Sequence, residues 1–144
     1  MDNIRSAYNV GSIFRTADGA GATRIFLCGF TPTPENPKVL KTSLGAEKTI
    51  EWEYCKQTWR IIDKLKAEGL WTIALETTKN SKNIFQRSSI VDRPLALIVG
   101  NEVKGVRASL LKRADQVVHI PMRGEKESLN VAVAAGIAVY EILK

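Results

Sequence analysis

Pro94-Leu-Ala-Leu-Ile-Val-Gly100-Asn-Glu102 is a continuous apolar run that ends in a glycine and two polar residues. Its first six residues fit a strand buried on both faces, as the strands of parallel sheets are. On either side of it, short β-rich runs alternate with helical patterns, which favours a mostly parallel sheet joined by crossover helices. The predicted fold class is therefore α/β, with helices flanking the sheet.

The other predicted strands and helices follow the same alternation along the chain. The strands are expected at 24–29, 49–54, 70–75, 94–99 and 116–120, and the helices at 9–20, 57–68, 107–113 and 128–143. Three prolines in 31–37 predict a loop there. Ser128 is the predicted N-cap of the last helix. That helix is apolar almost all round, which predicts deep burial.

Polar and glycine-containing segments follow three of the predicted strands, at 76–78, 100–105 and 121–127. Ligands of open α/β sheets bind beyond the carboxyl ends of the strands, so these loops predict a pocket at one edge of the sheet. No GxGxxG follows the first strand and no GxxxxGK[ST] occurs. A nucleotide-like ligand would therefore be held without the usual phosphate-binding loop.

Composition predicts one soluble domain over residues 1–144. Hydrophobic residues make up 44% and charged residues 25%, which is ordinary for a globular protein. The formal net charge of +6 favours a polyanionic partner such as nucleic acid, although many basic proteins have none. The most apolar stretch, 129–143, is too short to span a bilayer. We expect no membrane association.

The cysteine and histidine content argues against a metal site. Cys28 and Cys55 show no CxxC or metal-ligand spacing, and His119 is the only histidine in the chain. Reduced thiols are typical of a cytoplasmic protein, which is the expected location. No signal peptide is visible at the polar amino terminus.

Five polar residues stand out from small and apolar surroundings. Asn9 and Arg15 are six residues apart, about 600° of rotation, so they do not share one helix stripe, and Asn9 suits a helix cap. Arg15 is either an ordinary surface arginine or a functional group that interrupts an apolar helix. Glu102 is either a solvated loop carboxylate or a group facing the pocket. Ser128 and Asn130 fit helix capping and backbone satisfaction as well as a ligand-binding role.

Three segments containing these residues resemble, in order and spacing, the signature motifs of the SpoU-type (TrmH-like) RNA ribose 2′-O-methyltransferases of the SPOUT superfamily. The segments are 9–19, 98–102 and 120–134. The resemblance covers nearly the whole chain. It implies a SPOUT-type fold with a C-terminal trefoil knot, S-adenosylmethionine as cofactor, tRNA or rRNA as substrate, and a homodimer with no metal.

The resemblance also implies roles for particular residues. Arg15 matches the essential arginine of the family. Because a guanidinium almost never loses its proton, we prefer phosphate binding and alkoxide stabilisation to a general-base role. Asn9 would orient Arg15 or the ribose, and Glu102, Ser128 and Asn130 would complete the active site. The residues implied in the cofactor pocket are Thr77, Gly100, Ile120, Met122 and Leu129.

Two differences from the family affect RNA recognition. Only Met1 precedes the matched residues, so either the apolar strand that usually comes first is very short or the sequence is clipped at its start. No amino-terminal RNA-binding extension is expected. A set of basic residues near the loops could instead hold an RNA backbone. Its members are Lys38, Lys41, Lys48, Lys79, Lys82, Arg87, Lys104, Arg107, Arg123 and Lys126.

Two other functions fit parts of the pattern. One is a catalytically idle knotted module that binds RNA or protein, although such a module would not need Arg15, Glu102, Ser128 and Asn130 together. The other is an α/β nucleotide-binding domain with a small-molecule substrate. We therefore interpret the chain as an S-adenosylmethionine-dependent RNA 2′-O-ribose methyltransferase.

Overall fold

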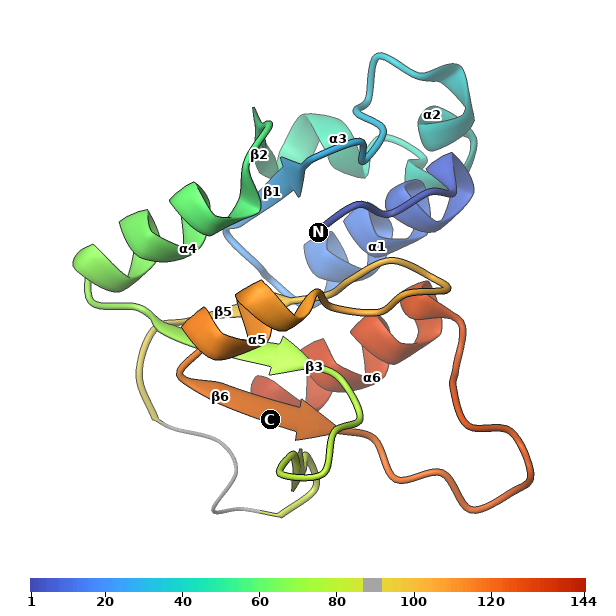
Figure 1. Ribbon diagram of the computed structural model, residues 1–144. Helices are drawn as coiled ribbons and strands as arrows, with labels where there is room; N and C mark the ends of the chain where they lie inside the picture. The colour runs from blue at the N-terminus through green and yellow to red at the C-terminus, as the bar shows by residue number, and fades with distance from the viewer. Residues whose placement is uncertain (87–91) are drawn as a thin grey trace.

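The computed structural model describes residues 1–86 and 92–144, in which strands and helices alternate (Figure 1). The helices are α1 (Ala7–Gly19), α2 (Pro37–Ser43), α3 (Ala46–Thr49), α4 (Thr58–Ala67), α5 (Ala108–Arg113) and α6 (Val131–Ile142). The strands are β1 (Arg24–Cys28), β2 (Glu51–Cys55), β3 (Trp71–Leu75), β4 (Lys82–Asn83), β5 (Leu95–Ile98) and β6 (Gln116–His119).

The described strands form two parallel sheets. One pairs β1 with β2, and the other has the order β4-β6-β3-β5. Every strand pair in both sheets is parallel. The order places β3 between β5 and β6, so the carboxyl ends of these three strands lie side by side. This α/β arrangement confirms the predicted fold class.

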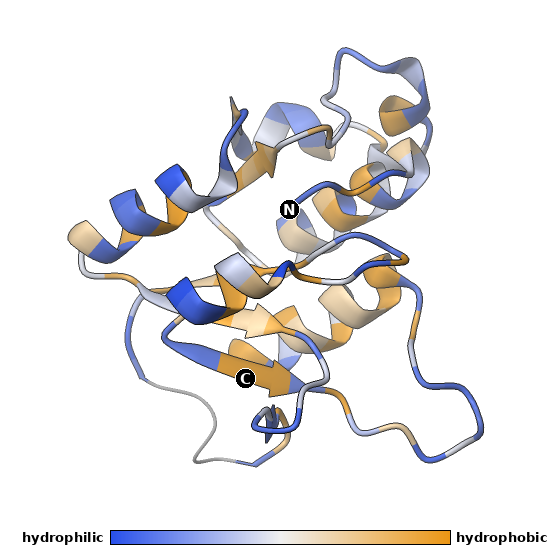
Figure 2. Ribbon diagram, viewed as in Figure 1, coloured by the Kyte–Doolittle hydropathy of each residue, from blue (hydrophilic) through white to orange (hydrophobic). Residues whose placement is uncertain are grey.

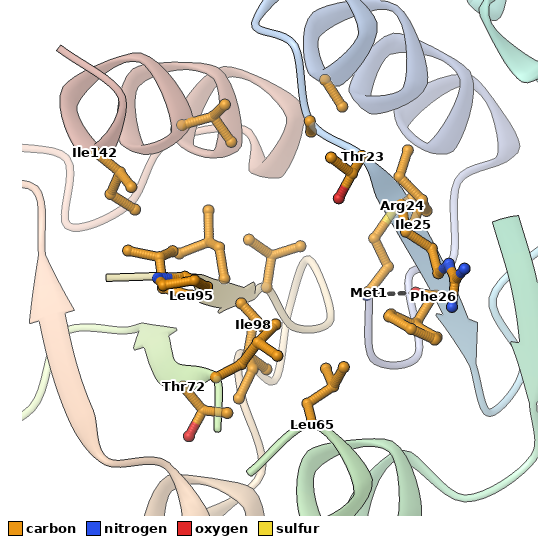
Figure 3. A pocket seen from close by; sticks show the side chains of 18 of the residues that line it. Met1, Thr23, Arg24, Ile25, Phe26, Leu65, Thr72, Leu95, Ile98 and Ile142 are labelled. Carbon is orange, nitrogen blue, oxygen red and sulfur yellow. Dashed lines mark hydrogen bonds between the residues drawn. The ribbon is translucent and has the colours of Figure 1, made fainter. Parts of the chain in front are cut away.

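The first three residues join the two sheets. The backbone N–H of Asp2 donates to Val99, and the N–H of Cys28 donates to Met1. Asp2 and Cys28 also form an isolated parallel bridge. Beyond it, β1 and β5 border a groove of about 970 Å³ (Figure 3). The Met1 amino group donates to the Phe26 carbonyl there, and burial lowers its pKa.

Helices cover both faces of the sheets because side chains alternate along each strand. On β3, Ile73 packs in a cluster with Ala138 of α6, whereas its neighbour Ala74 packs with Ile62 of α4 and Leu110 of α5. On β1, Ile25 and Leu27 join the cluster built around α1, while Cys28 packs against α4. Helices α1 and α6 therefore share one face, opposite α4 and α5.

Several predicted elements are confirmed with shifted ends, and others were missed. Ile13, Phe14 and Ala17 of α1 are buried as predicted. The short helices α2 and α3 and the two-residue β4 were not predicted. For α2, the prolines of 31–37 suggested only a loop. Pro37 in fact starts α2, where its missing N–H costs no hydrogen bond. Strand β5 is not buried on both faces: its first three residues are half-buried because they border the groove.

The closing helix differs from the prediction in length and burial. It begins at Val131 with Asn130 as its N-cap, so Ser128 is not the cap. Deep burial was also wrong, because only Ala135 and Ala138 are buried while Val133 and Tyr140 are more than half exposed. Figure 2 shows α6 coloured mainly as hydrophobic. Part of this apolar surface faces outward.

Candidate functional site

The Glu102 carboxylate binds the start of α1. It follows β5 and accepts hydrogen bonds from the backbone N–H groups of Arg5 and Ser6, at 2.8 and 2.9 Å, and from the Asn9 side chain at 3.0 Å. The N-terminus of a helix carries partial positive charge, which favours a carboxylate at this position. The neighbouring Asn101 side chain donates to the Asn3 carbonyl at 2.8 Å. The segment after β5 thus holds residues 3–9 in place.

These hydrogen bonds also keep Glu102 ionised. Burial alone would raise its pKa, but the N–H groups of Arg5 and Ser6 and the Asn9 amide together lower the pKa below its ordinary value. A carboxylate that is ionised and already accepts three hydrogen bonds is a weak candidate for a general base. Its arrangement suits an anchor for the neighbouring backbone.

Asn9 and Asn130 connect α1 to α6. The Asn130 amide donates to the Asn9 side-chain oxygen at 3.1 Å, while the Asn130 oxygen accepts from the N–H groups of Ala132 and Val133. Asn9 is not the cap of α1, because Ser6 fills that position. The structure therefore brings together Asn9, Glu102 and Asn130. We call this group the anchor cluster.

Arg15 lies outside the anchor cluster. The two residues are six positions apart, which at the rise of an α-helix places Arg15 about 9 Å further along α1 than Asn9. The rotation between them places Arg15 on a different side of the helix. Its guanidinium forms no hydrogen bond or ion pair within residues 1–86 and 92–144. It lines a second cavity, of about 560 Å³, together with Lys41 of α2 and Tyr140 of α6. Ser128 is exposed and forms no hydrogen bond with Asn9, Glu102 or Asn130.

The predicted cofactor edge is built from the ends of β3, β5 and β6. Glu76 follows β3 and accepts hydrogen bonds from Thr77 and Val106 N–H groups, each at 2.9 Å, so it ties the first loop to the second. Gly100 follows β5, and a Cβ added there would lie 2.5 Å from the Gly105 backbone. Gly100 is thus required by the tight turn that pairs Asn101 with Gly105.

This packing gives Gly100 a role in the loop itself. The family resemblance implied only that Gly100 lines the cofactor pocket. The clash with the Gly105 backbone means that valine would distort the loop itself. Ile120, Met122 and Leu129 belong to the segment after β6, which is exposed from 123 to 130 and returns to the start of α6 (Figure 1).

The large groove between β1 and β5 is separate from the predicted residues. Neither it nor the smaller cavity is lined by Thr77, Gly100, Ile120, Met122 or Leu129. The groove is mainly apolar, as the side chains around Leu95 and Ile98 show (Figure 3). It contains none of the predicted site residues, although charged side chains such as Arg24, Glu51 and Arg93 are among those that line it.

One member of the basic set has a structural role that the sequence did not reveal. Arg107 forms two hydrogen bonds with the Asp2 carboxylate, at 2.8 and 3.1 Å, and Thr58 also donates to Asp2. Asp2 is only 1% exposed, so this ion pair fixes the amino-terminal segment to α5. Arg87 lies outside the described residues.

Two classes of feature are missing from the part of the chain that the structure describes. No group of three His, Cys, Asp or Glu side chains is placed to hold a metal ion. No helix is long and apolar enough to cross a membrane. Cys28 and Cys55 are both free thiols, and Cys28 is buried.

Sequence comparison establishes the family. Residues 1–140 match the SpoU rRNA Methylase family, and the chain belongs to it. The 23S rRNA guanosine 2′-O-methyltransferase RlmB of Pseudomonas putida is 32% identical over 100% of this chain and 57% of its own length. RlmP of Bacillus subtilis, also a 23S rRNA guanosine 2′-O-methyltransferase, is 38% identical over 99% of this chain and 56% of its length. The chain spans little more than half of these relatives.

Solved structures agree with this assignment. An AdoMet-bound rRNA methyltransferase from Sinorhizobium meliloti superimposes with a TM-score of 0.90 and 31% identity, over 98% of this chain and 53% of that one. The TrmH/SpoU tRNA modifying enzyme of A. aeolicus gives a TM-score of 0.86 and 30% identity, over 99% of this chain and 71% of that one. The α/β core is thus shared with SpoU methyltransferases.

Proposed function

We propose that the chain is one SpoU-type domain that transfers a methyl group from S-adenosylmethionine to a ribose 2′-hydroxyl of rRNA or tRNA. The observation that carries the proposal is the family match over residues 1–140. The relatives are named as rRNA 2′-O-methyltransferases, and one similar structure has AdoMet bound. The net charge of +6 suits an RNA partner. A cytoplasmic location is part of the same proposal.

The edge formed by β3, β5 and β6 suits the cofactor. Its three loops leave the sheet side by side, as ligand-binding loops of parallel sheets do. The segment 123–129 is exposed and none of its backbone N–H groups is bonded within the described residues, so these donors are free to bind a ligand. Thr77, Gly100, Ile120, Met122 and Leu129 would line this site. The cofactor supplies an electrophilic methyl group with a good leaving group.

Arg15 would position the RNA and stabilise charge in the reaction. Its exposed guanidinium has no partner in residues 1–86 and 92–144, so its donors are free for a phosphate and for the ribose oxygen as that oxygen loses its proton. Holding the hydroxyl in line with the methyl group supplies much of the remaining acceleration. The anchor cluster would fix the direction of α1 and thereby the position of Arg15.

A methyl-transfer assay tests this function. The chain is incubated with radiolabelled S-adenosylmethionine and total RNA, and the modified nucleotide is mapped. We expect label on a ribose 2′-oxygen of rRNA or tRNA. Binding of RNA without any label would instead favour an idle binding module. Binding of plain nucleotides in place of the cofactor would favour a small-molecule enzyme.

We further propose a homodimer through the α1 and α6 face. Tyr8 on α1 and Val133 on α6 are exposed apolar side chains on neighbouring helices. Burying them against a second copy would remove this surface from water, and a stable interface would need about 800 Å² from each copy. Sedimentation should give twice the chain mass of 15.9 kDa at micromolar concentration. A monomer would contradict this arrangement.

The trefoil knot belongs to the proposal as well. The path supports it, because the chain leaves β6, makes a long excursion over 120–130 and returns to pack α6 beside α1 (Figure 1). A knot that tightens when the termini are pulled apart shortens the stretched chain. Optical-tweezer unfolding should therefore give an end-to-end length below that of a fully extended 144-residue polymer. The full length would exclude the knot.

A further inference from the structure

The loop after β3 is fixed to β6 at both of its ends. At the start of the loop, the backbone N–H of Glu76 donates to the Val118 carbonyl at 2.9 Å. At its end, the N–H of Ile84 donates to the His119 carbonyl at 3.0 Å, and β4 pairs in parallel with β6. The segment 76–84 therefore leaves the sheet and returns to the carboxyl end of β6.

A side-chain hydrogen bond connects this loop to the last residue of β6. Ser81 Oγ and His119 Nδ1 are 2.9 Å apart, and both residues are half-buried. Ser81 also closes the turn that precedes it, because its Oγ accepts from the Thr78 N–H at 3.0 Å and lies 2.8 Å from the Thr78 carbonyl oxygen. The His119 ring is thus bonded to the side chain that holds the 78–81 turn together.

The bond between Ser81 and His119 can form with the proton on either ring nitrogen. A serine hydroxyl has one proton to donate and can also accept, and a neutral imidazole carries its proton on one of its two nitrogens. If the Ser81 hydroxyl donates to the Thr78 carbonyl, a protonated His119 Nδ1 donates to Ser81 Oγ. If Ser81 instead donates to His119, Nδ1 accepts. The contact between the two side chains is kept in both arrangements.

The pair lies between two residues of the proposed cofactor site. Thr77 belongs to the same loop as Ser81, and Ile120 directly follows His119. The two segments leave neighbouring strands, since β3 and β6 are adjacent in the sheet. A ligand held by two loops binds more tightly when the loops are already in their bound positions, because ordering them then costs no binding energy.

We propose that Ser81 and His119 are positioning residues for the S-adenosylmethionine site, because their hydrogen bond fixes the loop after β3 relative to the segment after β6. The inference rests on the proposed methyl transfer for the identity of the ligand. The pair acts through Thr77 and Ile120, whose relative position it sets, and takes no part in the reaction itself.

Two variants of His119 test the hydrogen bond at constant shape. His119→Asn keeps a polar atom bonded to Cγ, where Nδ1 is in histidine, whereas His119→Leu has nearly the shape of asparagine but no polar atom. Calorimetric titration with S-adenosylmethionine measures the affinity of each. We expect His119→Leu to weaken binding about 5-fold, as the loss of one hydrogen bond does, and His119→Asn to stay near the wild-type value. Equal affinities of the two variants would overturn the proposal.

The partner of His119 is tested in the same way. Ser81→Ala removes the hydroxyl and should weaken cofactor binding by about the same 5-fold as His119→Leu. Asn80→Ala changes an exposed residue of the same turn and is the matched control, so its affinity should equal that of the wild-type chain. In the methyl-transfer assay, Ser81→Ala should raise KM for the cofactor and leave kcat unchanged, because the reacting groups are untouched. A fall in kcat with an unchanged KM would contradict a positioning role.

Amide hydrogen exchange tests the link between the two segments without any cofactor. In Ser81→Ala and His119→Leu, exchange should become faster both in 77–81 and at Ile120 and Met122, because each segment restrains the other. Faster exchange in 77–81 alone would mean that the bond orders only its own turn, and the proposal would be wrong.

The two proposals fail in different ways. If the wild-type chain binds no S-adenosylmethionine, the proposed function fails, whereas the exchange measurement still decides whether Ser81 and His119 link the two segments. If the wild-type chain binds the cofactor and methylates RNA while His119→Leu and Ser81→Ala keep full affinity, the proposed function stands and the positioning role is wrong.

Discussion

The anchor cluster and the Arg15 cavity lie on the same helix yet differ in how their polar groups are used. Asn9, Glu102 and Asn130 form hydrogen bonds with one another and with the backbone. Arg15, less than two turns further along α1, and Lys41 of α2 form none within residues 1–86 and 92–144. Polar groups that satisfy one another stabilise the fold, whereas polar groups left free near a cavity are available to a ligand.

This contrast divides the predicted catalytic residues by role. We expect Glu102 and Asn130 to act as positioning residues, because they connect the loop after β5 and the cap of α6 to α1. Arg15 remains the residue expected to contact the RNA. Substitution should therefore change stability in the first region and activity in the second.

The largest effect is expected at Arg15. Arg15→Ala removes a free, exposed cation, so methyl transfer should fall by about 10²-fold or more, as it does when one electrostatic partner of a transition state is removed. Cofactor affinity and the urea midpoint should stay near the wild-type values. Parallel assays of turnover, cofactor binding and unfolding measure the three quantities. A matching loss of stability would place Arg15 with the structural residues instead.

Glu102→Gln should mainly lower stability. The amide can still accept hydrogen bonds, but it loses the charge that favours the N–H groups of Arg5 and Ser6. We expect a loss of about 1–2 kcal/mol in the free energy of unfolding, within the range for hydrogen bonds to charged groups. Urea denaturation measures it. Unchanged stability with abolished turnover would make Glu102 catalytic and would break the contrast between the regions.

The pH dependence of unfolding checks the same carboxylate. Because the pKa of Glu102 is lowered in the folded state, its stabilisation is present above its unfolded pKa of about 4.3 and is lost as pH falls through the folded value. Stability should thus decrease from about pH 5 downward, and Glu102→Gln should show a smaller decrease. The pKa of Asp115 is also lowered in the folded state, so Asp115 should preserve part of the pH dependence of stability in Glu102→Gln. Identical slopes would contradict this role.

The smallest effects separate the two candidates for the α6 cap. Asn130→Ala removes the observed cap and its bond to Asn9, so it should cost about 1 kcal/mol of stability. Ser128→Ala is the control, and because Ser128 is exposed and does not cap the helix, the change should stay within about 0.5 kcal/mol. Thermal unfolding of both variants compares them. A larger loss at Ser128 would restore the sequence prediction.

Sequence patterns predicted the core of the fold well. The apolar run at 94–99 and the alternation around it correctly predicted a parallel α/β arrangement, because strand and helix periods are local properties. Helices α2 and α3 were missed because they contain only seven and four residues, too few for a period to stand out. The burial of α6 was overestimated because composition cannot tell which apolar face lacks a covering element.

The candidate site was predicted only in part. Motif spacing singled out Asn9, Glu102 and Asn130, which do meet in space. Lys41 was predicted only as one of ten basic residues, and Tyr140 was not singled out at all. Their meeting with Arg15 depends on the packing of α1 between α2 and α6, a long-range contact that no local pattern encodes.

The most direct test of the account is the turnover of Arg15→Lys on the RNA that the methyl-transfer assay identifies. Lysine keeps the charge but lacks the planar fork that engages a phosphate and a ribose oxygen together. We expect methyl transfer to fall by about 10²-fold, as for loss of a transition-state partner, while cofactor affinity and the urea midpoint stay unchanged. If lysine restores most of the activity, charge alone suffices and the proposed role of the Arg15 guanidinium is wrong.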